Sequence, residues 1–191
     1  MPINIPIFLT WLRVALIPLV VGVFYLPNSW MGTFDRSLAA TIVFIVAAAT
    51  DWLDGYLARR WNETSSFGAF LDPVADKLMV AGALLVLVQL DRANALIAFI
   101  IIGREIAISA LREWMARIGA SKSVAVSSIG KIKTVAQMTA IPMLLYYENL
   151  FGFIDTRFWG NGLLVIAAVL TVWSMFYYLR KAWPLIRERT G

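Results

Sequence analysis

Residues 50–77 read TDWLDGYLARRWNETSSFGAFLDPVADK, a segment in which four aspartates fall within 26 positions: Asp51, Asp54, Asp72 and Asp76. The whole chain is 60% hydrophobic and 15% charged. A soluble domain carries roughly a quarter charged residues, so this composition indicates an integral membrane protein. Charge is costly near the apolar interior of a bilayer, so four carboxylates gathered there indicate a functional site.

Six apolar runs surround or include this segment, and crossing a bilayer takes about 20 such residues. They cover residues 7–26, 38–57, 69–90, 93–115, 134–147 and 163–179. We therefore expect an all-α integral membrane protein with six transmembrane helices, forming a single membrane domain over residues 1–191. Residues 1–6, MPINIP, are too short to span, and we expect them to lie along the membrane interface.

The Lys and Arg residues between these runs predict the orientation. Eleven fall in the loops and tail on one side of the expected membrane and three on the other. Because cytosolic loops are enriched in Lys and Arg, we expect the first set, and with it both termini, to be cytosolic. Topology accounts for the net charge of +5, and we expect no nucleic-acid partner.

The chain contains neither Cys nor His. This excludes thiolate nucleophiles, imidazole bases and the usual zinc ligands. Chemistry in this protein must therefore use carboxylates, hydroxyls, Lys, Arg and hard metal ions.

At about 100° per residue, each acidic pair shares a helix face with residues that have almost no side chain. Asp51 and Asp54 lie with Gly55 and Ala58, and Asp72 and Asp76 lie with Gly68 and Ala75. The short polar connection between the two runs predicts antiparallel neighbours whose acidic faces oppose each other. Oxygen ligands alone suit Mg²⁺, Mn²⁺ or Ca²⁺, and four carboxylates are enough for two ions that clamp a phosphoryl displacement. Gly55 and Ala58 leave room for a nucleotide, and Arg59 offers a fork that matches a phosphate.

The spacing D-x2-D-G-x2-A-R-x8-G-x3-D-x3-D runs from Asp51 to Asp76 with every position met. It resembles the signature of the CDP-alcohol phosphotransferase family. Residues 4–18, 103–116 and 123–138 resemble the bacterial branch that uses sn-glycerol 3-phosphate as its acceptor.

This resemblance implies a homodimeric enzyme of the bacterial cytoplasmic (inner) membrane, in contact with membrane lipids and with its site open to the cytosol. It implies transfer of a phosphatidyl group from CDP-diacylglycerol to sn-glycerol 3-phosphate, with release of CMP. It assigns Asp51, Asp54, Asp72 and Asp76 to two divalent ions, Mg²⁺ or Mn²⁺, and Asp76 also to the base. The CDP-diacylglycerol site would include Gly55, Ala58, Arg59, Ser65 and Gly68.

The expected acceptor pocket is basic. Arg104 and Arg112 lie on one helix, and Lys131 and Lys133 open the next, so we expect these four to bind the acceptor phosphate. For Arg104 the alternative is an ion pair with Glu105 or an aspartate, and Glu105 itself is expected to be structural. Thr10 and Arg13, near the cytosolic start of the first helix, are expected to contact the nucleotide or diphosphate.

Two other functions stay open at this point. The same aspartates serve family members that use inositol phosphate, serine or another alcohol as acceptor. Buried acids also occur in divalent-cation transporters, although these usually place them near the midplane between repeated halves.

Overall fold

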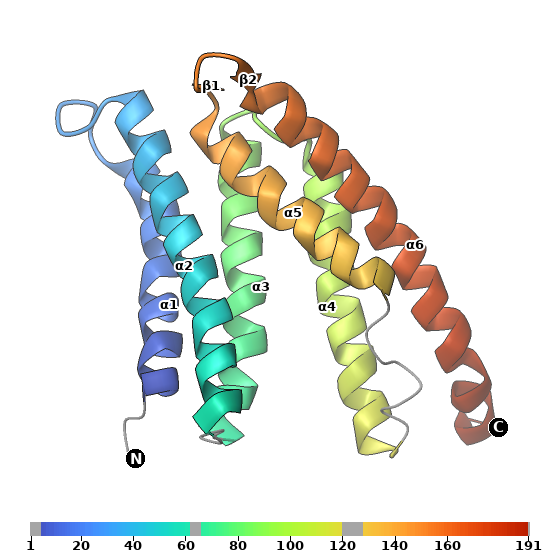
Figure 1. Cartoon of the computed structure of the whole chain (residues 1–191). Helices are drawn as coiled ribbons and strands as arrows, with labels where there is room; N and C mark the ends of the chain where they lie inside the picture. Colours follow the sequence, from blue (N-terminus) through green and yellow to red (C-terminus); the bar gives the residue numbers. More distant parts are fainter. Residues whose placement is uncertain (1–4, 62–65, 120–127, 191) are drawn as a thin grey trace.

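The computed structural model describes residues 5–61, 66–119 and 128–190, and these form six α-helices, one short 3₁₀ helix and a two-stranded hairpin (Figure 1). In chain order they are α1 (Ile5–Gly22), η1 (Val23–Tyr25), α2 (Thr33–Trp61), α3 (Ser66–Gln89), α4 (Ala95–Arg117), α5 (Ser128–Tyr146), β1 (Asn149–Leu150), β2 (Ile154–Asp155) and α6 (Thr156–Thr190). The all-α prediction is confirmed, and each expected apolar run lies largely within one helix. Most of the expected interfacial segment, residues 1–4, falls outside the described residues.

Three helices of the described chain are long and apolar enough to cross a membrane: residues 8–25, 33–57 and 156–184. The other three, α3, α4 and α5, do not meet the same criterion. A physical reason is visible in their sequences, because α3 carries Asp72, Asp76 and Lys77, α4 carries five charged residues, and the first half of α5 carries two lysines and a glutamine. Six membrane crossings therefore remain a prediction.

The core lies where α1, α2, α3 and α5 meet, and α4 and α6 complete it. Phe44, Leu84, Ile101 and Leu144 are almost fully buried there. Small residues allow helices to approach closely in membrane proteins. Here such residues are buried on five of the helices: Ala40, Ala47, Ala75, Ala83, Ala98, Ala140, Ala167 and Ala168.

Helix α1 lies against both α2 and α3, whereas α2 and α3 touch each other only slightly. The prediction that the two acid-bearing helices run antiparallel is confirmed (Figure 1). Their direct packing was overestimated, because no local sequence pattern indicates that α1 lies against both of them. This placement determines what the carboxylates contact.

Arg92 joins three parts of the fold at the end away from the chain termini. Its guanidinium donates to the backbone oxygen of Leu145 at 2.7 Å and to Ser37 Oγ at 2.9 Å. It also lies 4.4 Å from the centroid of the Tyr147 ring. The turn before α4 is thereby tied to the start of α2 and the end of α5.

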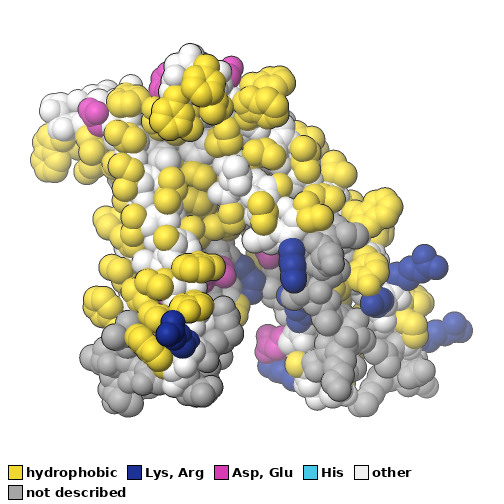
Figure 2. All heavy atoms as spheres, in the orientation of Figure 1, with side chains coloured by type: hydrophobic (Ala, Val, Ile, Leu, Met, Phe, Trp, Pro, Cys, Tyr) yellow, Lys and Arg dark blue, Asp and Glu magenta, His cyan; other side chains and the backbone are white. Residues whose placement is uncertain are grey.

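Hydrophobic side chains cover most of the visible surface, while Lys and Arg gather toward the end where α1 begins and α6 ends (Figure 2). Large apolar residues such as Phe70, Phe99 and Trp173 are about two-thirds exposed or more. Such a surface suits contact with lipid. At the basic end a hollow opens between two groups of helices, with α1, α2 and α3 on one side and α4, α5 and α6 on the other. Charged side chains line this hollow (Figure 2).

Candidate active site

A guanidinium from α1 lies among the carboxylates of α2 and α3. Arg13 Nη1 is 2.5 Å from Asp51 Oδ1 and 3.0 Å from Asp76 Oδ1, and Arg13 Nη2 pairs with Asp54 Oδ2. The Arg13 side chain is fully buried, whereas those of Asp51 and Asp76 are 39% and 48% exposed. The acid-bearing helices thus meet through α1, and two of their carboxylates stay accessible to a ligand.

The fourth aspartate is held by the same face of α1. Thr10 Oγ1 donates a hydrogen bond to Asp72 Oδ1 at 3.0 Å. Thr10 and Arg13 are three residues apart and so share a helix face. The predicted convergence of four aspartates is therefore present, and the structure places Thr10 and Arg13, expected at the nucleotide, directly on these acids.

Among the described side chains the charge of this cluster is unbalanced, since Arg13 pairs with three of the four carboxylates and Thr10, which is neutral, binds the fourth. Oxygen-only donors with excess negative charge fit hard divalent ions such as Mg²⁺ or Mn²⁺. Among the described residues, no three acidic side chains stand together as a ready-made metal cage, and Arg13 lies between them. The donor set fits the expected ions, although the carboxylates are arranged around Arg13.

The other residues expected around CDP are only partly described. Gly55 and Gly68 are half-buried, on α2 beside Asp54 and on α3 one turn before Asp72. The side chains of Ala58 and Arg59, and all of Ser65, lie outside the described residues. Their assignment to the nucleotide stays a prediction.

A second charged group links α4, α5 and α6. Glu105 on α4 pairs with Lys133 on α5, and its Oε1 lies 3.2 Å from Arg104 Nη1. Arg104 Nη2 donates to Ser174 Oγ on α6 at 2.9 Å. Lys133 and Arg104 are buried. The ion pair of Arg104 with Glu105, the alternative to phosphate binding by Arg104, is present, and Glu105 is the shared counter-ion of two buried cations.

Tyr178 on α6 connects Arg104 and Arg112 of α4. Its hydroxyl accepts a hydrogen bond from Arg112 Nη2 at 3.2 Å, and its ring centroid lies 5.6 Å from Arg104 Cζ and 5.2 Å from Arg112 Cζ. Sequence reasoning missed Tyr178 and Ser174. The sequence signal available for them was that these two polar side chains lie four residues apart in an otherwise apolar helix. Lys131, expected in the same pocket, lies exposed at the start of α5.

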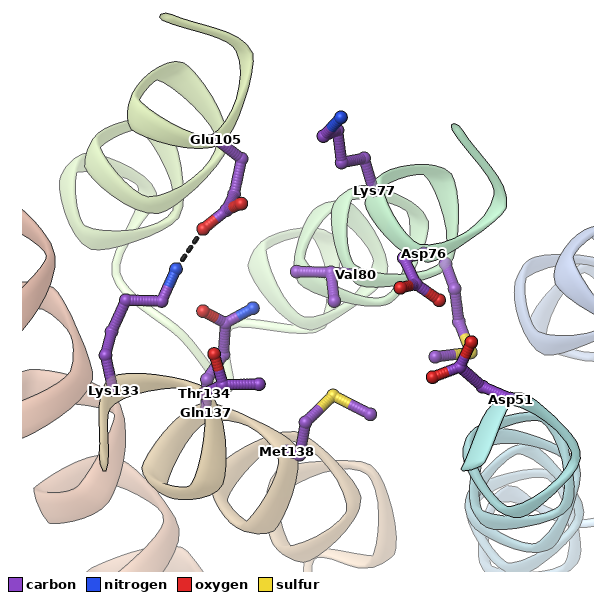
Figure 3. A pocket seen from close by; sticks show the side chains of 10 residues that line it. Asp51, Asp76, Lys77, Val80, Glu105, Lys133, Thr134, Gln137 and Met138 are labelled. Atoms are coloured by element: carbon purple, nitrogen blue, oxygen red, sulfur yellow. Dashed lines mark hydrogen bonds and ion pairs between the residues drawn. The ribbon is translucent and has the colours of Figure 1, made fainter. Parts of the chain in front are cut away.

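A cavity of about 250 Å³ joins the two charged groups. Asp51 and Asp76 line one side of it, and Glu105 and Lys133 line the other (Figure 3). Gln137, one turn after Lys133 on α5, lies between these sides (Figure 3). Carboxylates on one side, and on the other a lysine whose partner Glu105 also pairs with Arg104, suit a polar substrate that carries an anionic group.

Residues 3–173 match the sequence pattern of the CDP-alcohol phosphatidyltransferase family. The chain belongs to this family. It is 52% identical over 184 residues to the CDP-diacylglycerol–glycerol-3-phosphate 3-phosphatidyltransferase of Escherichia coli (strain K12). The aligned residues make up 95% of this chain and 96% of the relative. Proteins of the same name from Shigella flexneri serotype 5b (strain 8401) and Shigella sonnei (strain Ss046) match with the same identity and coverage.

Membership in the CDP-alcohol phosphatidyltransferase family confirms the resemblance carried by the aspartate signature. The protein is accordingly a transferase of phospholipid biosynthesis, and cation transport is not favoured. The family signature covers the acidic side of the cavity. The opposite side, lined by residues of α4 and α5, lies outside that signature.

Proposed function

We propose that the protein transfers the phosphatidyl group of CDP-diacylglycerol to sn-glycerol 3-phosphate, giving phosphatidylglycerophosphate and CMP. The observation that carries this proposal is the cavity between Asp76 and Lys133, which has a half-exposed carboxylate at one side and a buried cation at the other. The shared name of the relatives supports the same two substrates.

Asp76 is the proposed base. Its carboxylate is half-exposed to the cavity and is held by Arg13 at 3.0 Å. With no His in the chain, a carboxylate is the group available to take the proton of the attacking hydroxyl. The hydroxyl oxygen then bonds to the β-phosphorus, and CMP leaves with the electron pair of the bond that breaks. One direct displacement is sufficient, without a covalent enzyme intermediate.

Lys133, Arg104 and Arg112 are proposed to bind the acceptor phosphate, with Lys131 at the entrance. Lys133 lines the cavity, whereas Arg104 and Arg112 are not among its lining residues and are linked to Lys133 through Glu105 and Tyr178. Fixing the phosphate at this side directs the acceptor's free hydroxyl toward Asp76. Positioning of this kind lowers a reaction barrier by removing orientational freedom before the chemical step.

Asp51, Asp54, Asp72 and Asp76 would hold two divalent ions, Mg²⁺ or Mn²⁺. When bound, these ions would supply positive charge to the diphosphate and to the departing CMP. The nucleotide is proposed to lie against a set of residues beside the aspartates: Gly55, Ala58, Arg59, Ser65, Gly68, Thr10 and Arg13. Within this set, Thr10 and Arg13 hold the carboxylates in place.

The proposed setting is a homodimer in the bacterial cytoplasmic membrane, with six crossings and the cavity facing the cytosol. The apolar surface and the three helices able to span support a membrane location. The excess of basic residues at the end of the molecule near the cavity supports the cytosolic orientation.

The closest alternative is the same chemistry with inositol phosphate or serine as acceptor. Purified protein in detergent with CDP-diacylglycerol and Mg²⁺ should release CMP with sn-glycerol 3-phosphate and far more slowly with the other two. Equal or faster release with serine would assign a different acceptor. Addition of EDTA should stop the reaction, and Mg²⁺ or Mn²⁺ should restore it.

A further inference from the structure

Gln137 is a buried polar residue that faces the cavity without a role in the mechanism above. Its side chain is only 4% exposed, and it projects from α5 into the space between Lys133 and the two cavity aspartates (Figure 3). Lys133 and Gln137 are four residues apart, so they share one face of the helix. The two side chains thus line the cavity in sequence, from the basic side toward the acidic side.

The amide oxygen of Gln137 is buried and has no hydrogen-bond partner within the described part of the chain. Buried polar atoms are nearly always paired, because an unpaired acceptor has given up water without compensation. An unpaired acceptor in the wall of a substrate cavity is readily explained by a donor that arrives with the substrate. The amide can also turn over and present its NH₂ group instead, so it can accept or donate at this place.

We propose that Gln137 determines acceptor specificity by bonding the hydroxyl of glycerol 3-phosphate that does not attack. This inference rests on the proposed function. With the phosphate at Lys133 and the terminal hydroxyl at Asp76, the secondary hydroxyl on the middle carbon lies between these groups. Gln137 lies between the same two groups in the wall of the cavity.

This contact would distinguish acceptors that phosphate binding alone treats alike. A three-carbon phosphate that lacks the middle hydroxyl fits the same space and carries the same charge. It leaves the amide oxygen unpaired in a buried site, and such a loss lowers transition-state binding.

The test compares sn-glycerol 3-phosphate with 3-hydroxypropyl phosphate, which differs only by that hydroxyl. For the wild-type protein we expect kcat/KM for CMP release to be about tenfold higher with glycerol 3-phosphate, the size of effect that one neutral hydrogen bond gives. Equal kcat/KM for the two acceptors would overturn the inference while leaving the proposed function intact. Release of CMP with neither acceptor would overturn both.

The variant Gln137→Met removes the amide and keeps an unbranched side chain of similar length. It should lower kcat/KM for glycerol 3-phosphate about tenfold and leave 3-hydroxypropyl phosphate nearly unchanged, so that the discrimination disappears. If Gln137 were purely structural, its replacement would lower kcat/KM equally for both acceptors, and that result would contradict the inference. Thr139→Val is the matched control on α5, because Thr139 is exposed and its hydroxyl bonds its own helix at Val135.

Discussion

Arg13 and Glu105 have matching roles at the two sides of the cavity. Arg13 supplies one positive charge to a group of carboxylates, and Glu105 supplies one negative charge to Lys133 and Arg104. Buried charges are tolerated when they are paired, and removing one partner leaves the other uncompensated. Both residues therefore neutralise part of the charge on their side of the cavity.

The variant Glu105→Gln should lower the free energy of unfolding by about 3 kcal/mol, because it leaves two buried cations without their carboxylate. Glu113→Gln is the matched control on the same helix. Its carboxylate is 66% exposed and pairs with an exposed Arg117, so the loss there should stay below about 1 kcal/mol. Chemical denaturation in detergent micelles measures both changes, and equal losses would contradict the role given to Glu105.

Asp76→Asn should reduce kcat by roughly 10²–10⁴-fold, because the amide cannot take a proton from the acceptor hydroxyl. Binding of CDP-diacylglycerol should remain measurable, since the other aspartates and Arg13 are retained. Asp91→Asn, in the exposed turn between α3 and α4, is the control and should turn over normally. Normal turnover of Asp76→Asn would show that another group is the base.

The apolar pattern of the sequence was sufficient to locate each helix along the chain. It did not show which helices pack against one another. Apolar runs and the short polar link predicted α2 and α3 as an antiparallel pair. Contact of Arg13 with residues 38, 41 and 63 positions away depends on how α1 packs, which no local pattern records. For the same reason the acidic side of the cavity could be predicted, while Ser174, Tyr178 and Gln137 emerged only from the structure.

The packing of α5 on α6 depends on a glycine. A Cβ atom at Gly160 would lie 2.8 Å from Leu144 Cγ and 2.9 Å from Leu144 Cδ2, whereas one at Gly162 would meet nothing within 4 Å. Gly160→Ala should therefore lower the thermal midpoint, with a stability loss of about 1–3 kcal/mol from overpacking. Gly162→Ala should be neutral or stabilising by up to about 1 kcal/mol, since Ala favours helix. The reverse order would contradict the described α5–α6 contact.

At the scale of the whole molecule, the cavity lies toward the basic end, and the hairpin between α5 and α6 lies at the opposite end (Figures 1 and 2). The proposed orientation places these ends on opposite sides of the membrane. The natural chain has no Cys, so one introduced thiol reports on one position.

Single variants Arg117→Cys, at the end of α4, and Phe151→Cys, in the hairpin, test that orientation. In intact cells, a membrane-impermeant maleimide should label Phe151→Cys, and should label Arg117→Cys only after the cells are opened. Both residues are exposed, so each thiol is accessible to reagent on its own side. The opposite labelling pattern would invert the proposed topology.

The proposed function depends on the binding of divalent ions by the four aspartates, against the diphosphate of the substrate. Its most direct test is the electron paramagnetic resonance signal of free Mn²⁺ during titration into purified protein with CDP-diacylglycerol. We predict two bound ions per chain, and none in a variant with Asp51, Asp54, Asp72 and Asp76 all replaced by Asn. Unchanged Mn²⁺ binding by that variant would contradict the account.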